Sequence, residues 1–420
     1  MNQSEAPGAP GAPGAPDVAR TPPGPEGPGR TAGRHYLDHA STSPLRPEAR
    51  SALEAALELP AADPGRVHHE GRTIRAWLEG AREQVAELFG VRPRQVVLTS
   101  GGTEAINAAV WGALGGARGP GDLTSGPRLV ACAAVEHSAV RAASERLGRI
   151  VDLPVDATGR LSADGVADAL ERCRIEHGRL PDLAHCQWAN HEVGTVQPVA
   201  EVVAVCHAYG VPVHVDAVAA AGHLQVDAGA LGAELVSVSS HKLGGPAGAG
   251  ALLVGRSLRY EPLLVGGDQE RARRAGFENV PAAIGFGAAA AVLSAPGRLA
   301  AESARALALT RRLAAGLCAV EGVTRYGHPT EHLPHLVTVG VDGVEGEPVL
   351  LGLDQRGIAA HSGSSCSSES LEPSPVLAAM GVDGERSLRL SVGWSSTDAD
   401  VDACLAAFPD VVAGLRRLRR

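Results

Sequence analysis

Short apolar runs alternate with Ala-rich helical stretches along most of this chain of 420 residues, and this alternation constrains the fold more than any other feature. The apolar runs are 95–99, 128–133, 183–188, 211–215, 235–239 and 251–254, and the helical stretches include 104–114, 138–147 and 199–209. Strands that are apolar on both faces and separated by helices indicate a mostly parallel sheet covered on both sides. The sequence therefore predicts an α/β fold with helices on both faces of the sheet.

Composition divides the chain into four predicted parts. Residues 1–33 are a Pro/Gly/Ala-rich tract that cannot bury a core, and we expect them to be disordered. A large sheet-bearing domain follows over 34–280, and its first segment, 35–50, can pack on a second domain. A long Ala-rich helix over 281–318 leads to that second, smaller α+β domain at 319–420. Ligands of open parallel sheets bind beyond the carboxyl ends of the strands, so functional residues are expected there.

Charge and cysteine usage exclude several classes of protein. The formal net charge of −9 argues against a nucleic-acid partner. No stretch approaches about 18 consecutive apolar residues, so no membrane span is expected, and no secretory signal is recognisable. The seven cysteines are odd in number, widely spaced and without a CxxC pair. That pattern argues against a zinc site or a disulfide framework and predicts a reducing, cytoplasmic location.

The chain contains one lysine, Lys242, and its other 37 basic Lys/Arg positions are all arginine. Arginine can replace lysine in salt bridges and anion contacts, but its guanidinium stays protonated and cannot act as a nucleophilic amine. Lys242 lies between an apolar strand and a Gly-rich loop, which does not suit a surface lysine kept by chance. It is therefore a candidate Schiff-base lysine.

A glycine-rich turn joins a predicted strand to a predicted helix at Gly101, Gly102 and Thr103. Two glycines allow close backbone approach, the Thr hydroxyl donates, and a helix N-terminus favours an anion, so this turn can hold a phosphate. A turn that only caps a helix would look the same. Ser239 and His241, next to the lysine, could bind the same phosphate.

Two further polar residues lie at ends of predicted strands. Asp216 follows an apolar strand and is either a helix cap or a carboxylate that holds a protonated pyridine nitrogen. His137 lies where a strand passes into a helix. It is either structural or, in a pyridoxal site, a ring-stacking acid/base group.

Cys366 lies among serines and a glycine in a polar stretch, whereas a structural cysteine normally has apolar neighbours. The other six cysteines occupy apolar or helical stretches, as buried structural cysteines do. A thiol on an exposed polar loop suits a nucleophile that must reach a substrate and then carry a group away.

Arg389 is flanked by leucines on a predicted strand, so its charge needs an anionic partner. That partner is either a substrate carboxylate or an acidic side chain in a structural ion pair.

In this order the residues resemble a cysteine desulfurase of the NifS/IscS type, within the fold-type I, class V aminotransferase-like pyridoxal-phosphate enzymes. The resemblance covers roughly residues 35–405. The matching stretches are 36–40, 98–107, 135–140, 189–198, 213–217, 239–252, 266–281, 362–377 and 387–393. The cysteine loop followed by SLEPS is the most specific of them.

The resemblance implies pyridoxal 5′-phosphate as the cofactor and L-cysteine as the substrate. Lys242 would form the Schiff base and move the Cα proton, His137 would stack on the ring, and Asp216 would hold its nitrogen. The phosphate ligands would be Gly101, Gly102, Thr103, Ser239 and His241. The substrate carboxylate would meet Arg389 and His191. Cys366 would receive the sulfur as a persulfide, leaving L-alanine. A homodimer and a sulfur-acceptor protein are implied as well.

Four departures from the family pattern leave alternatives open. Ala219 stands where the family has a Gln that contacts the cofactor, and His191 replaces an Asn. Phe277 replaces a Thr that reaches the neighbouring subunit. Residues 63–68 differ from the family's Asn-Pro-Ser-Ser-x-His motif. Losing two hydrogen bonds at about 1 kcal/mol each weakens cofactor binding without abolishing chemistry. A related selenocysteine or C–S lyase, or a catalytically weak relative acting as a sulfur-transfer partner, are the competing hypotheses.

Overall fold

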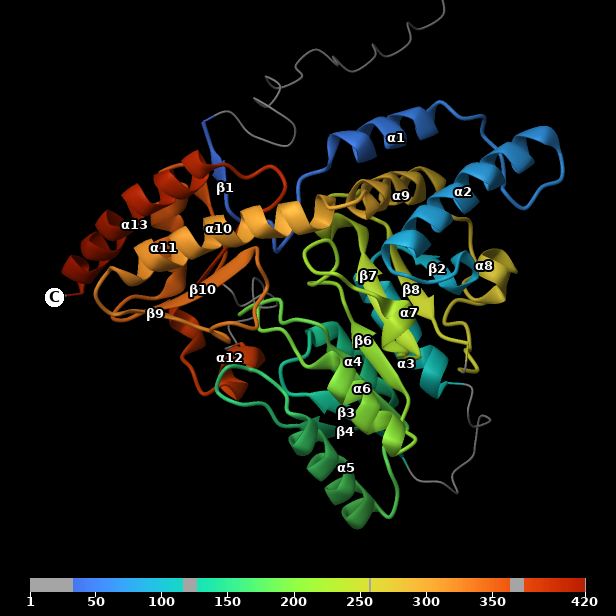
Figure 1. Cartoon of the computed structure of the whole chain (residues 1–420), viewed down its shortest axis with the longest axis horizontal. Helices are drawn as coiled ribbons and strands as arrows, with labels where there is room; N and C mark the ends of the chain where they lie inside the picture. Colours follow the sequence, from blue (N-terminus) through green and yellow to red (C-terminus); the bar gives the residue numbers. More distant parts are fainter. Residues whose placement is uncertain (1–32, 116–126, 257, 363–373, 420) are drawn as a thin grey trace, which may run out of the picture.

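The computed structural model describes residues 33–115, 127–256, 258–362 and 374–419. The predicted disorder of the N-terminal tract and the predicted nucleophile Cys366 both lie outside the described residues. Two sheet-bearing parts, joined by helices, make up the rest (Figure 1).

The larger sheet has seven strands in the order β2-β8-β7-β6-β5-β3-β4. Their bounds are β2 Val96–Thr99, β3 Arg128–Ala133, β4 Gly148–Leu153, β5 Leu183–Gln187, β6 Val213–Asp216, β7 Leu235–Ser239 and β8 Gly250–Val254. Only β8 runs antiparallel to its neighbours, so the predicted α/β fold is confirmed. The sequence missed β4 because this edge strand is mostly half-exposed and its residues are not a continuous apolar run.

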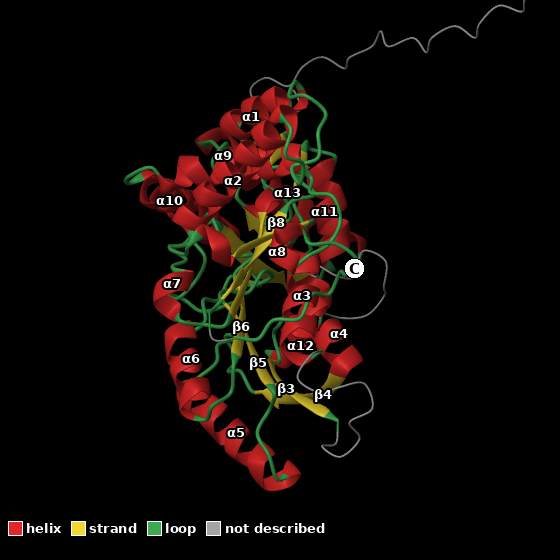
Figure 2. Cartoon of the chain, turned by 90° about the vertical axis from the view of Figure 1, so that its right-hand side faces the viewer, coloured by secondary structure: helices red, strands yellow, loops and turns green. Residues whose placement is uncertain are grey.

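Helices cover both faces of this sheet, as two-sided apolar strands require. Figure 2 shows the sheet between two helical layers, α5, α6 and α7 on one side and α3 and α4 on the other. Their bounds are α3 Gly102–Leu114, α4 Ser138–Leu147, α5 Ala163–His177, α6 Val199–Ala208 and α7 Ala228–Leu231. Small apolar residues fill the core, and Phe89 and Phe286 are among the few large side chains buried there.

The predicted single helix over 281–318 is wrong, because the structure contains two helices there. The first, α9 (Val280–Ser294), and the second, α10 (Arg298–Cys318), meet at a bend of 82°. Pro296 cannot continue a helix and Gly297 takes the left-handed backbone at φ 75°, which together end α9. No single helix in the described part of the chain is long and apolar enough to cross a membrane.

Helix α9 is apolar on all sides and mostly buried between α1 (Pro47–Leu57) and α2 (His69–Leu88). At Gly287 an added Cβ would lie 2.7 Å from the Cα of Ala81, so glycine is needed where α9 crosses α2.

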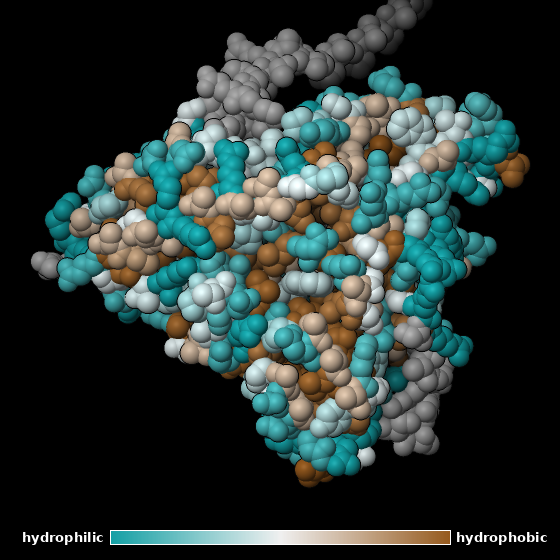
Figure 3. Space-filling view, in the orientation of Figure 1, coloured by the Kyte–Doolittle hydropathy of each residue, from teal (hydrophilic) through white to brown (hydrophobic). Residues whose placement is uncertain are grey.

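Figure 3 shows apolar residues gathered in the middle of one face, below α10, with hydrophilic residues over its margins.

The smaller sheet is antiparallel, in the order β12-β10-β9, and has its own apolar core. The bounds are β9 Val323–Arg325, β10 Leu336–Val341 and β12 Ser387–Ser391, with α11 at Gly346–Asp354 and α13 at Asp398–Leu418. The N-terminal strand β1 (His35–Tyr36) pairs with β11 (Ile358–Ala359), so the start of the described chain packs on this part. The exact domain boundaries stay a prediction.

Candidate active site

Lys242 ends a short 3-10 turn, Ser240–Lys242, that follows β7 at the carboxyl edge of the large sheet. Its Nζ donates to the backbone oxygens of Ala40, at 2.6 Å, and Ser41, at 3.0 Å. Burial, helped by the charge of Arg389, lowers the pKa of this amine to about 8. The one lysine of the chain is thus an amine that is partly neutral near physiological pH.

Asp216 and Ser239 lie beside Lys242 because β6 and β7 are parallel neighbours whose carboxyl ends meet at one edge. An Asp216 oxygen accepts from the Val218 N–H at 2.9 Å, and burial raises the pKa of its carboxyl. The Ser239 hydroxyl is buried and has no hydrogen-bond partner among the described residues. Both polar groups therefore lie where a bound ligand could reach them.

The turn at Gly101 and Gly102 opens α3 without any side-chain cap on its first N–H groups. At Gly102 an added Cβ would lie 2.9 Å from Val218 Cγ2, so only glycine allows this close approach. Thr103 follows on the first turn of the helix and is exposed.

Burial, followed by the charge of Lys242, lowers the pKa of His241 to about 4.

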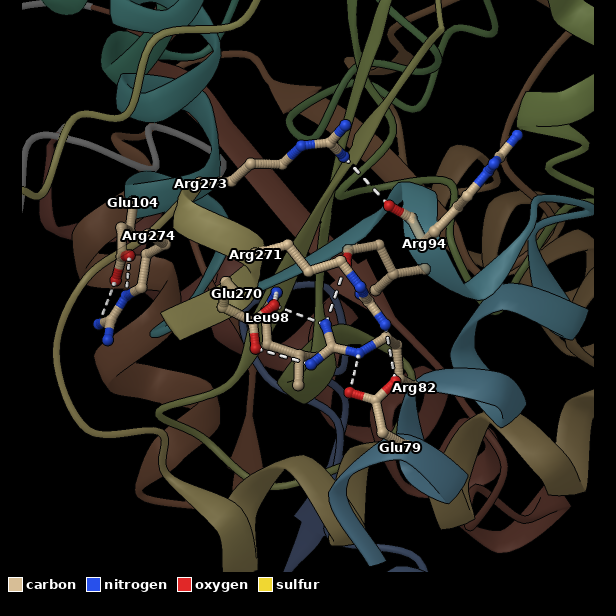
Figure 4. Close-up of polar contacts among 10 residues, drawn as sticks. Glu79, Arg82, Arg94, Leu98, Glu104, Glu270, Arg271, Arg273 and Arg274 are labelled. Atoms are coloured by element: carbon tan, nitrogen blue, oxygen red, sulfur yellow. Dashed lines mark hydrogen bonds and ion pairs between the residues drawn. The ribbon is translucent and has the colours of Figure 1, made fainter. Parts of the chain in front are cut away.

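An unusual backbone segment holds this turn in place. In α8 (Gln269–Ala272) the non-glycine residues Glu270, Arg271 and Ala272 all have positive φ, a costly conformation. The Glu270 carboxylate accepts from the Arg82 guanidinium at 2.5 and 2.7 Å and from the Leu98 N–H at 2.8 Å (Figure 4). The ion pair fixes α8 to α2, and the hydrogen bond with Leu98 fixes α8 to β2, the strand that leads into the glycine turn.

His137 and His191 face each other across the site, with ring centroids 4.8 Å apart at 58°. The structural interpretation of His137 is confirmed, since its Nδ1 caps α4 by accepting from the Ala139 N–H at 3.1 Å, and its ring-stacking role stays a prediction. Burial, with smaller effects of His191 and Lys242, lowers its pKa to about 3, so the ring is neutral. His191 Nε2 lies 3.6 Å from a Glu192 carboxylate oxygen.

Arg389 reaches the same site from β12 of the small sheet. Its guanidinium donates to His191 O at 2.8 Å, Ser41 Oγ at 2.7 Å and Asp38 Oδ1 at 3.2 Å. Its Nε is buried and has no hydrogen-bond partner among the described residues. The ion pair that the sequence left open is therefore present, and it lies beside Lys242, whose pKa Arg389 lowers.

Sequence reasoning missed two residues at this end of the site, Asp38 and His361. His361 lies directly opposite Arg389 in an antiparallel bridge, which puts both side chains on one face of the small sheet. Asp38 arrives through the pairing of β1 with β11, segments more than 300 residues apart. No local pattern could have revealed either contact, because both depend on the tertiary pairing of distant segments.

The departures from the family pattern have visible consequences. Ala219 lines a small cavity together with His191 and Lys242. Phe277 is 63% exposed. His68 caps α2 by accepting from the Gly71 N–H at 3.2 Å, so this altered motif has a structural role.

The prediction that six cysteines are buried is correct for five and wrong for Cys318. Cys318 is exposed because it is the last residue of α10, where the apolar face of the helix ends. Burial raises the pKa of Cys206 and of Cys404 to about 12, so these thiols are unreactive. The described residues contain no cluster of histidine, cysteine or carboxylate side chains suited to a metal ion.

Comparison with known proteins decides the family. The class-V aminotransferase model matches residues 35–404. This chain belongs to the class-V aminotransferase family. An IscS-like cysteine desulfurase of Mycobacterium tuberculosis is 40% identical, over 91% of this chain and 97% of the relative. The cysteine desulfurase IscS of Methanosarcina thermophila is 37% identical, over 91% and 93% of the two chains.

Solved structures agree with this membership. A NifS-like protein superimposes with a TM-score of 0.80 at 26% identity, covering 91% of this chain and 100% of that one. For the fold alone, a cysteine desulfurase from Thermococcus onnurineus gives a TM-score of 0.78 at 23% identity, over 91% and 95% of the two chains. The chain is a member of the family's cysteine desulfurases, which depend on pyridoxal 5′-phosphate, and the resemblance read from the sequence is confirmed.

The described residues fit this cofactor. The unpartnered Ser239 hydroxyl and the uncapped start of α3 suit its phosphate, since a helix N-terminus and buried donors favour an anion. Lys242 supplies the only side-chain amine for its aldehyde, and the buried Asp216 supplies a carboxylate for its ring nitrogen.

Proposed function

We propose that this protein converts L-cysteine to L-alanine and passes the sulfur, as a persulfide on Cys366, to an acceptor. The observation that carries this proposal is the neighbourhood of the single lysine. A buried amine with a pKa of about 8 lies between a carboxylate from the large sheet and an arginine from the small one. Such a lysine can form a Schiff base and can also act as a base.

The proposed cofactor contacts all come from the large sheet. Lys242 binds the aldehyde, Asp216 the ring nitrogen, and His137 stacks on the ring. The proposed phosphate ligands are Gly101, Gly102, Thr103, Ser239 and His241. When bound, pyridoxal phosphate supplies a ring that accepts the electron pair released at the substrate Cα. A negative Asp216 keeps a proton on the ring nitrogen and so favours that acceptance.

The proposed substrate contacts come from the small sheet and the N-terminal segment. Arg389 binds the substrate carboxylate, which takes the place that Asp38 occupies beside the guanidinium. His191 donates from the other side. With the carboxylate fixed there, the Lys242 amine takes the Cα proton and later returns one. The neutral ring of His137 is the second group available for proton transfer.

The sulfur step belongs to Cys366, which lies outside the described residues. Its thiolate attacks the substrate sulfur, an S–S bond forms as the substrate C–S bond breaks, and a proton adds to the substrate Cβ to give alanine. The described residue that follows this stretch, Ser374, donates to Glu192 Oε2 at 2.5 Å. That contact ties Ser374 to the segment that carries His191.

We also propose that the protein works as a homodimer and that a separate sulfur-acceptor protein receives the persulfide. Support for the dimer comes from large exposed apolar side chains: Val265 is 78% exposed, Phe277 63% and Trp77 45%. Trp77 borders an apolar groove between α2 and α9. A contiguous apolar groove of this kind is typical of an interface.

One experiment tests the proposed function against its alternatives. The purified protein, loaded with pyridoxal phosphate, is incubated with L-cysteine and a reductant, and alanine and sulfide are measured. Cys366→Ser should lose both products and keep the cofactor absorption band, whereas Cys318→Ser, which alters the one exposed cysteine among the described residues, should behave like the wild type. Sulfide production by Cys366→Ser would indicate a cysteine-independent lyase. A protein that cannot bind the cofactor would refute both enzyme hypotheses.

A further inference from the structure

Two histidine rings stack on each other behind Lys242, and the proposed chemistry does not use them. The rings of His223 and His335 lie 3.4 Å apart between centroids, with an angle of 12° between their planes. His223 follows β6 of the large sheet, and His335 directly precedes β10 of the small sheet. The stack is therefore a contact between the two sheet-bearing parts.

His335 is fixed to the strand that carries Arg389. Its backbone oxygen accepts from the Val392 N–H at 2.9 Å, just beyond the end of β12. The next residues of β10 pair with β12, and Thr338 lies opposite Arg389 in that ladder. His335 cannot shift without moving this ladder, so its ring has a fixed position relative to the Arg389 backbone.

His223 is fixed to the other side of the site. Its backbone oxygen accepts from Ser303 Oγ at 2.6 Å, and its ring lies next to the Lys242 backbone. It lines the small cavity that contains Ala219 and Lys242, and a second small cavity on the side of Arg46. The ring thus separates two spaces, both of which border Lys242.

The shape of the His335 ring matters more than its hydrogen bonding. Its side chain is 2% exposed, and its Nδ1 has no hydrogen-bond partner among the described residues. Burial holds the pKa of both imidazoles low, so both rings are neutral. Two neutral flat rings at stacking distance pack face to face in a thin space, and an aliphatic side chain cannot do so.

We propose that the stacked rings of His223 and His335 are positioning residues that set the Lys242 amine at its working distance from Arg389. The inference rests on the proposed function, in which Arg389 holds the substrate carboxylate and Lys242 takes the Cα proton. Both groups act on one small substrate. A misplacement of about 1 Å can lower the rate of proton transfer about 100-fold. The stack links the two along a short path, from β12 through His335 and His223 to the Lys242 backbone.

The test compares His335→Phe, which keeps a flat ring, with His335→Leu, which does not. In the loaded enzyme, His335→Leu should lower kcat by about 10- to 100-fold with KM changed by less than about threefold, because Arg389 is untouched. The isotope effect with Cα-deuterated cysteine should rise, since proton transfer becomes slower. His335→Phe should stay close to the wild type. His332→Leu, a partly buried histidine of the same segment, is the matched control.

A second readout needs neither cofactor nor substrate. Because Lys242 is the only lysine, ¹³C-dimethylation gives one lysine signal in a nuclear magnetic resonance titration, and Lys242→Arg distinguishes it from the N-terminal amine. The pKa should stay near 8 in the wild type and in His335→Phe. In His335→Leu it should rise toward 10.5, because water enters the space beside the amine.

The proposal is overturned if the leucine and phenylalanine variants share the same kcat, isotope effect and amine pKa, whether at wild-type values or equally displaced from them. If His335→Leu does not fold, His335→Met replaces it as a flexible side chain of similar size. A wild-type protein that forms no alanine would overturn the proposed function, and the amine titration would still test the stack.

Discussion

The cofactor side and the substrate side of this site differ in how their polar groups are satisfied. On the cofactor side, the Ser239 hydroxyl is buried without a partner among the described residues and α3 begins without a cap. On the substrate side, Arg389 already donates to Asp38, Ser41 and His191. Binding the cofactor therefore adds hydrogen bonds, whereas binding a substrate carboxylate exchanges existing ones. Cofactor binding should therefore be tight, and substrate binding should be weaker and reversible, as turnover requires.

The largest effect expected on the cofactor side comes from Lys242→Arg. It keeps a positive charge but removes the amine, so alanine formation should fall about 1000-fold or more. Borohydride reduction with pyridoxal phosphate should then leave no labelled side chain, because no other lysine exists. Labelling of another internal residue would show that the site has been assigned wrongly.

On the substrate side, Arg389→Leu should raise KM for L-cysteine about 100-fold, the loss of roughly 3 kcal/mol from charge-assisted hydrogen bonds. Cofactor affinity, measured by absorbance titration, should change little. The control is Arg386→Leu, which removes an exposed arginine three residues earlier and should leave KM unchanged. A large loss of cofactor binding in Arg389→Leu would remove the distinction between the two sides.

Ser239→Ala tests the cofactor side more finely. The cofactor dissociation constant should rise about tenfold through the loss of one buried hydrogen bond to an anion. The cofactor-free protein should not lose stability, because this hydroxyl has no partner among the described residues. Ser41→Ala should show the opposite pattern, with an altered KM and an unchanged cofactor affinity.

The pH dependence of cofactor loading tests the environment of the lysine. Only the neutral amine condenses with an aldehyde, so the loading rate should rise about tenfold per pH unit below the amine pKa and level off above about pH 8. A lysine at its ordinary pKa of 10.5 would level off only near that pH. The negative charge of Asp38 raises the Lys242 pKa, so Asp38→Asn should move the midpoint to lower pH.

The same division explains how much the sequence could predict. Lys242, Asp216, Ser239 and the Gly101 turn lie at strand ends of one parallel sheet, so local patterns and the fold class together bring them to one edge. The structure brings these residues together at that edge. His137 was left between two interpretations because a helix cap and a ring-stacking group use the same position.

The substrate side was less predictable because it is built by tertiary pairing. Asp38 comes to Arg389 through β1 and β11, and His335 comes to Lys242 through the packing of two sheets, neither of which has a local signature. The break between α9 and α10 was missed for a different reason. The composition stays helical on both sides of Pro296, and only the Pro-Gly pair marks the bend.

The central claim is that sulfur leaves L-cysteine for Cys366 while Lys242 moves the proton. The most direct measurement is the mass of the loaded protein after one turnover without reductant, followed by peptide mapping. One added sulfur atom on the Cys366 peptide and one alanine released per chain are expected, with neither in Lys242→Arg. Alanine released without added sulfur on Cys366, or sulfur found on Cys318 instead, would contradict it.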